Sequence, residues 1–148
     1  EIAAGARSAA EAHVLAQLRR SRLPDFELNV PVVDVNGKTL FVLDVLWRRY
    51  RAVLEIEGRE YHFGAAEWQS TLRRHNALTA AKLALLHYPP SALMGRDNAW
   101  LGEIERWLRT RADELGVAYT SGRPDRPLSL SEPQPWLIHS ASPRLTAS

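Results

Sequence analysis

The stretch from residue 39 to residue 62 most constrains how this chain folds. It contains two apolar runs, 39–47 and 52–57, which are rich in Leu, Val, Ile and Phe and are separated by Arg48-Arg49-Tyr50-Arg51. Short apolar runs bounded by polar residues are typical of buried strands. We therefore expect two antiparallel strands joined by a short basic turn.

The two runs also carry three acidic residues, Asp44, Glu55 and Glu57. A turn that is symmetric about its centre places Asp44 directly opposite Glu55, and opposed residues share one face of a sheet with their Cβ atoms roughly 4.5–5.5 Å apart. Glu57 follows two residues later, so the pleat returns it to that face. The sequence therefore predicts three carboxylates on one patch of a mostly apolar sheet.

Such a cluster is unfavourable by itself, because like charges raise each other's pKa values and burial disfavours ionisation. A divalent cation removes this penalty, and hard oxygen ligands suit Mg²⁺ or Mn²⁺. The alternative is that one carboxylate caps a turn while the others face solvent on an edge strand. Three acids on one face within apolar runs favour the metal site.

The length of 148 residues suits one domain with a single core. The chain has no cysteine and no apolar run near the roughly 20 residues of a membrane span, so we expect a cytoplasmic protein that makes no contact with a membrane. It opens on Glu1 rather than Met, from which we expect a processed chain or a fragment with an additional domain on its N-terminal side. Seventeen arginines stand against two lysines, which suits phosphate binding, although a GC-rich genome explains the excess equally well.

A helix is expected before the strands. Ser8-Ala9-Ala10-Glu11 is a capping-box pattern, and the helix that it begins runs to about Ser21. Glu11 lies beside the apolar stripe of this helix. It either bonds back to the backbone at Ser8 or points at the acid cluster, and both interpretations stay open. Residues 26–35 are expected to form a first strand, which Asn36-Gly37 joins to the next through a type I′ turn.

Further elements follow the acid-bearing strands. The pattern predicts a helix over 65–81 with Trp68 and Leu72 on its buried side, a strand over 83–88, and a long amphipathic helix from about 97 to 116. Both faces of the second strand are apolar enough to be covered, which implies helices on each side of the sheet. Residues 119–148 hold five of the nine prolines and many serines, which predicts a linker or a disordered tail.

The order of these elements, with acids on the second and third strands, resembles the core of the PD-(D/E)XK nuclease superfamily. More closely, the chain resembles the branch related to very-short-patch-repair endonucleases, on the basis of Asp44, Leu54-Glu55-Ile56-Glu57-Gly58, Tyr61-His62 and Arg74. The resemblance covers about residues 8–93. It implies an α/β, restriction-endonuclease-like domain over residues 1–118. The implied mixed sheet has about four strands, a three-stranded antiparallel meander plus one, with helices on both faces.

The resemblance also implies a function, which is a metal-dependent endonuclease that hydrolyses DNA phosphodiester bonds with Mg²⁺ or Mn²⁺. The implied metal ligands are Asp44, Glu55 and the backbone carbonyl of Ile56. Glu57 or His62 would accept a proton from the attacking water, and Glu11 would support the site. The arginines expected to contact the DNA backbone are Arg48, Arg49, Arg51, Arg59, Arg73 and Arg74.

Two positions depart from the pattern that carries the resemblance. Glu57 stands where the superfamily has a lysine and the closer branch commonly has Asp, and Thr71 stands where that branch has an acid three residues before Arg74. A carboxylate does not stabilise negative charge on a phosphate as a lysine does. The alternative function is therefore a catalytically inactive, nuclease-fold DNA-binding module of a larger regulatory or defence protein. A plain interaction domain is a third interpretation, which the acid cluster argues against.

Overall fold

The computed structural model describes residues 2–56, 65–95, 97–127 and 132–138 of the chain. The predicted order of a helix, three strands, a helix, a strand and a long helix is confirmed, with a 3-10 turn (η1), a short helix (α3) and a fifth strand in addition. The elements are α1 (Ile2–Arg20), β1 (Glu27–Val33), β2 (Thr39–Trp47), η1 (Arg48–Tyr50), β3 (Ala52–Ile56), α2 (Ala65–Ala80), β4 (Ala84–Tyr88), α3 (Pro90–Leu93), α4 (Ala99–Leu115) and β5 (Trp136–Leu137).

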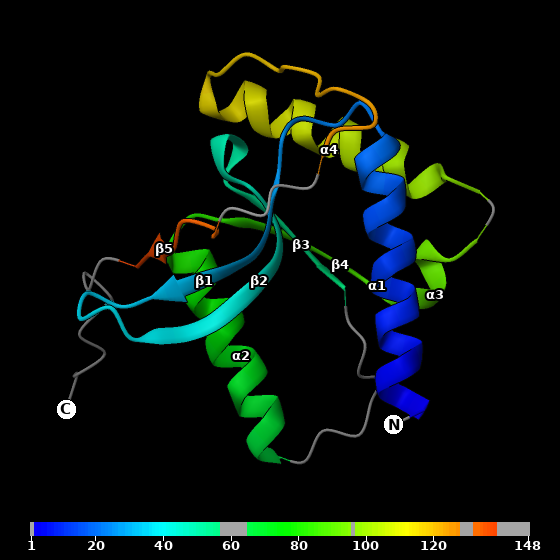
Figure 1. Ribbon diagram of the computed structural model, residues 1–148. Helices are drawn as coiled ribbons and strands as arrows, with labels where there is room; N and C mark the ends of the chain where they lie inside the picture. Colours follow the sequence, from blue (N-terminus) through cyan, green and yellow to red (C-terminus); the bar gives the residue numbers. More distant parts are fainter. Residues whose placement is uncertain (1, 57–64, 96, 128–131, 139–148) are drawn as a thin grey trace.

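The strands form one mixed sheet in the order β4-β3-β2-β1-β5 (Figure 1). β1, β2 and β3 make the predicted antiparallel meander, and β4 joins β3 in parallel. The α/β class is confirmed, but the sheet has five strands rather than about four. The extra strand is β5, which pairs in parallel with the end of β1 because the Trp136 ring packs beneath the guanidinium groups of Arg48 and Arg51.

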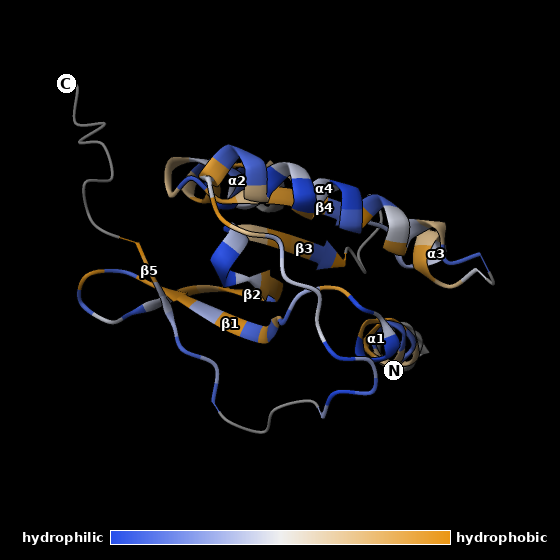
Figure 2. Cartoon of the chain, turned by 90° about the horizontal axis from the view of Figure 1, so that it is seen from above, coloured by the Kyte–Doolittle hydropathy of each residue, from blue (hydrophilic) through white to orange (hydrophobic). Residues whose placement is uncertain are grey.

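Helices cover both faces of the sheet. Alternate residues of β3 show this, because Ala52 and Leu54 pack in a cluster with α1 and α4, whereas Val53 packs in a second cluster with Leu78 of α2. We call these the α1/α4 cluster and the α2 cluster. Seen from above, the apolar strands lie between α2 and α1 (Figure 2). The centre of the sheet is therefore buried on both sides, as the apolar runs predict, whereas Leu40 and Val42 in the first half of β2 are 46% and 44% exposed.

The turn between β2 and β3 is symmetric, as predicted. Trp47 pairs with Ala52 and Val45 pairs with Leu54. One 3-10 turn spans Arg48–Tyr50, and Arg51 closes it with a left-handed backbone at φ +48°. Continuing this register by one residue places Asp44 opposite Glu55.

The β1–β2 hairpin differs from the predicted type I′ turn. That turn requires positive φ at both central residues, yet of Asn36 and Gly37 only Gly37 has it, at +82°. Instead, Asp34 organises a wider turn, because its Oδ1 accepts the backbone N–H groups of Asn36 at 2.8 Å and Lys38 at 3.0 Å. The type I′ prediction is wrong, although the hairpin itself is present.

The start of α1 also differs from prediction. The helix begins at Ile2, six residues before Ser8, so Ser8 lies inside the helix rather than at its N-cap position. The segment from residue 2 to residue 10 is rich in alanine, which has the highest helix propensity and extends the helix toward the N-terminus. The capping-box interpretation of Ser8 and Glu11 is therefore wrong.

The buried side of α2 was predicted incorrectly. Trp68 and Leu72 are 54% and 42% exposed, while Leu78 is buried. Arg74, one turn before Leu78, reaches the sheet instead. The helix presents polar residues to the sheet here because the underlying patch of β2 and β3 carries carboxylates.

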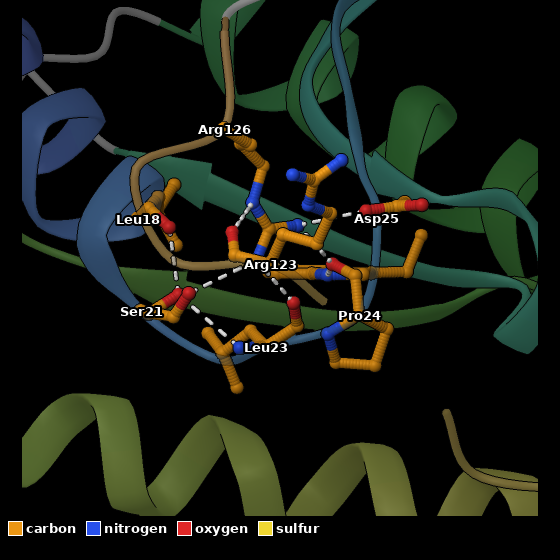
Figure 3. Close-up of polar contacts among 8 residues, drawn as sticks. Leu18, Ser21, Leu23, Pro24, Asp25, Arg123 and Arg126 are labelled. Atoms are coloured by element: carbon orange, nitrogen blue, oxygen red, sulfur yellow. Dashed lines mark hydrogen bonds and ion pairs between the residues drawn. The ribbon is translucent and has the colours of Figure 1, made fainter. Parts of the chain in front are cut away.

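The described part of the segment after residue 118 packs on the domain. Arg126 inserts at the connection between α1 and β1, where its side chain is 10% exposed (Figure 3). Its Nη2 donates to the carbonyls of Ser21 at 3.0 Å and Leu23 at 2.6 Å, and its Nη1 donates to the carbonyl of Pro24 at 3.2 Å and to Asp25 Oδ1 at 3.1 Å. These carbonyls follow the last turn of α1, where helical partners are lacking.

Gly122 makes this docking sterically possible. Its N–H donates to the carbonyl of Arg22 at 3.0 Å. A Cβ at this position would overlap the Arg126 guanidinium and the carbonyl of Leu23. We expected a linker or disordered tail over 119–148. Residues 119–127 and β5 instead pack on the domain. Arg126 and Trp136 hold them there, although this segment has no periodic pattern of its own.

Candidate active site

The hydrogen-bonded ladder between β2 and β3 ends at the acid pair. Paired residues run from the turn to Val45 and Leu54, and beyond them β3 pairs only with β4. At the next rung, hydrogen bonds to the two carboxylates take the place of backbone–backbone hydrogen bonds between the strands. Asp44 N–H donates to Glu55 Oε2 at 3.3 Å, and Ile56 N–H donates to Asp44 Oδ2 at 2.7 Å. The two strands therefore separate where Asp44 and Glu55 meet.

A backbone irregularity on β1 accompanies this rung. The β1–β2 register places Asn29 opposite Asp44, and Asn29 has a left-handed backbone at φ +52°. Leu43 packs in the α2 cluster but Val45 packs in the α1/α4 cluster, although a regular pleat puts residues i and i+2 on one face. The pleat of β2 is therefore interrupted at Asp44.

Burial makes Glu55 the unusual member of the pair. The whole residue is 4% exposed, whereas Asp44 is half-buried. Desolvation and, secondly, the charge of Asp44 raise the pKa of Glu55 to about 8, against a smaller opposing effect of Arg74. Burial and the charge of Asp44 therefore favour the protonated form of Glu55 when no metal is bound.

Arg74 connects α2 to this pair. It donates to Glu55 Oε1 and, at 3.1 Å, to the carbonyl of Val42, and its guanidinium lies 5.3 Å from the centre of the Phe41 ring. One arginine thus spans β2 and β3 where the ladder between them ends. Of the arginines expected to contact DNA, Arg74 lies at the acid pair.

The structure adds His87, which sequence reasoning missed. The parallel register of β3 and β4 pairs Glu55 with His87, so Asp44, Glu55 and His87 occupy one row across three strands. His75 of α2 meets His87, with ring centroids 5.2 Å apart. A histidine in the predicted fourth strand was the available signal, but a parallel register cannot be read from sequence because no short turn sets it.

The arginines of the β2–β3 turn lie away from the acid pair. Three residues of β3, or about 10 Å, separate the turn from Glu55. Glu27 binds Arg48 at 2.7 and 2.9 Å, and the carbonyl of Gln134 also accepts from it. Arg51 covers the Trp136 ring, while Arg49 and Arg73 are exposed. Arg48 and Arg51 thus anchor the β5 segment.

The other residues expected at the site are Glu11, Ile56, Glu57, Arg59 and His62. Glu11 lies inside α1 and is half-buried. Ile56 reaches Asp44 through its backbone N–H. Glu57, Arg59 and His62 lie outside the described residues.

The described residues offer two carboxylates for a metal ion rather than a complete ligand set. No three of their His, Asp and Glu side chains are close enough together to bind a metal. Mg²⁺ often takes only one or two protein carboxylates and completes its shell with water and substrate phosphate. The oxygen chemistry of Asp44 and Glu55 therefore fits Mg²⁺ or Mn²⁺.

Comparisons of the chain with protein-family models, with curated proteins and with solved structures find no match. The residues of the site are therefore the basis for assigning a function. Among the described helices, none has the length and apolarity needed to cross a membrane.

Proposed function

We propose that this chain is a metal-dependent endonuclease with a restriction-endonuclease-like core that hydrolyses DNA phosphodiester bonds, with Mg²⁺ or Mn²⁺ as its cofactor. The supporting observation is the meeting of Asp44 and Glu55 at the end of the β2–β3 ladder, with Glu55 buried and its pKa raised to about 8. A sheet gains no stability from burying two carboxylates together. A divalent cation bound between them removes that penalty, so the arrangement favours metal binding.

Each described residue then has a defined role. Asp44 and Glu55 would hold the metal ion, and Arg74, which donates to Glu55, would donate to a phosphate oxygen bound near the pair. When bound, the ion supplies Lewis acidity and a coordinated water of lowered pKa. The resemblance implies that Glu57 or His62 would accept the proton from that water. Both residues lie outside the described part of the chain.

One observation favours the alternative, an inactive DNA-binding module. The pair is already partnered without metal, because Asp44 accepts from Ile56 N–H and Glu55 accepts from Asp44 N–H and Arg74. In that case the carboxylates substitute for missing ladder bonds, and the exposed Arg49 and Arg73 bind phosphates.

Nicking of supercoiled plasmid DNA in Mg²⁺ or Mn²⁺, against an EDTA control, distinguishes the two functions. We expect the wild-type chain to cleave, and Asp44→Asn and Glu55→Gln to abolish cleavage. Glu105→Gln is the matched control, because Glu105 lies on α4 with its side chain 44% exposed and borders Arg109 at 3.9 Å. If the chain binds DNA but neither cleaves it nor binds Mn²⁺, the inactive module is supported. Absence of DNA binding would contradict both functions.

A further inference from the structure

Two exposed histidines meet at the edge of the sheet. His75 comes from α2 and His87 comes from β4, and their ring centroids lie 5.2 Å apart with planes at 62°. Both belong to regular elements, and α2 packs against β4, so the fold itself holds the two rings at this separation. The pair is separate in chemistry from Asp44 and Glu55, because it offers nitrogen rather than oxygen.

The separation of the rings matches that of two imidazoles on one metal ion. A Zn–N bond of about 2.0–2.1 Å places the metal about 3.2 Å from the ring centroid, so two imidazoles at a tetrahedral angle have centroids about 5.2 Å apart. The structure has this distance between His75 and His87. The rings are therefore close enough to bind one ion once rotation of the exposed side chains turns a nitrogen of each ring toward it, because the pair is edge-to-face in this structure.

We infer that His75 and His87 form a binding site for a borderline transition metal, with Zn²⁺ as the natural probe. Imidazole nitrogen suits Zn²⁺, Ni²⁺ and Cu²⁺, whereas Mg²⁺ and Mn²⁺ prefer oxygen. No third His, Asp or Glu of the described residues joins them closely enough to complete a metal centre. Two imidazoles supply two of the ligands, and water or a bound ligand can occupy further positions on the ion. This inference goes beyond the proposed function and does not depend on it.

Calorimetric titration of Zn²⁺ into the full chain tests the site. We use about pH 7.5, because imidazole must be deprotonated to bind a metal. One zinc ion is expected per chain, and His75→Asn or His87→Asn should each lower the affinity about tenfold or more, since each removes one of two protein ligands. Asn76→Ala is the matched control, because Asn76 is the exposed neighbour of His75 on α2 and should leave zinc affinity unchanged.

The same titrations separate this site from the acid pair. Asp44→Asn and Glu55→Gln should leave zinc affinity unchanged, while His75→Asn should leave Mn²⁺ affinity unchanged. Absence of zinc binding, zinc binding that survives both histidine substitutions, or zinc binding that disappears with Glu55→Gln would overturn the inference. Circular dichroism checks folding, and His75→Asn keeps the test available if the strand variant does not fold, because His75 lies on the exposed surface of a helix.

Discussion

Asp44 and Glu55 face each other on the rung where the ladder between β2 and β3 ends, and each carboxylate accepts a backbone N–H from the other strand. The strands stay joined there through side chains, while their backbones separate. Two acids are thus held together, with Glu55 buried and Arg74 bonded to it. The following predictions concern this rung and the segments that position it.

Glu55 should make stability fall as the pH rises. Its pKa is about 8 in the folded chain against an ordinary value of 4.5, so the folded state binds the proton more tightly than the unfolded state does. The favourable contribution is complete below about pH 4.5 and is lost as the pH rises to about 8. Urea unfolding of wild type and Glu55→Gln from pH 4.5 to 8.5 measures the difference. Equal pH dependence in both proteins would contradict the prediction.

Glu55→Gln should therefore stabilise the metal-free protein above pH 8. Glutamine fills the same space and still accepts from Arg74, but it needs no ionisation in a buried position. The free energy of unfolding should rise by about 1–3 kcal/mol, given that each pKa unit corresponds to about 1.4 kcal/mol. Metal binding should be lost in the same variant. A fall in stability above pH 8 would show that the charged Glu55 supports the fold.

Bound Mn²⁺ should displace a proton from the acid pair. Because the raised pKa of Glu55 favours its protonated form without metal, the ion competes with that proton. Mn²⁺ affinity should rise between about pH 6 and pH 8.5 and then level off. Calorimetry in buffers of different ionisation enthalpy measures the proton released. Affinity that is independent of pH would place the ion elsewhere.

Substitutions of Arg74 and Arg73 should differ in their effect on the pKa of Glu55, although the two residues are neighbours on α2. Arg74→Ala removes the cation that lowers the pKa of Glu55, so this pKa should rise above 8, whereas Arg73→Ala should leave it unchanged. Each substitution should weaken DNA binding and reduce the salt slope by about 0.9 if it removes one phosphate contact. Carbon-detected NMR titration and binding at several salt concentrations provide the two measurements. Identical effects of both variants on the Glu55 pKa would contradict the placement of Arg74.

Arg126→Ala should destabilise the domain, although the residue lies in a proline-rich segment. It removes hydrogen bonds to the carbonyls that follow α1 and to Asp25, which we expect to lower the free energy of unfolding by about 2–4 kcal/mol. Gly122→Ala should act in the same direction, because its Cβ overlaps the Arg126 guanidinium. Arg123→Ala is the control, since its side chain is exposed. Urea unfolding compares the three, and an unchanged midpoint for Arg126→Ala would mean that the segment does not stay docked.

The sequence by itself determined the β2–β3 pair and the rung that joins Asp44 to Glu55. The physical reason is that a short turn between two apolar runs sets the register over the next few residues, so this part of the site depends on contiguous residues alone. The order of the larger helices and strands follows from the same local patterns.

Tertiary structure decided the features that depend on distant residues. The parallel register that places His87 beside Glu55, the face that α2 turns to the sheet, the interruption of the pleat opposite Asn29 and the docking of Arg126 all join segments far apart in the chain. No local pattern encodes them, because each reflects which polar and apolar groups satisfy one another once the chain is folded. The acid pair is therefore readable from the sequence, whereas its surroundings are not.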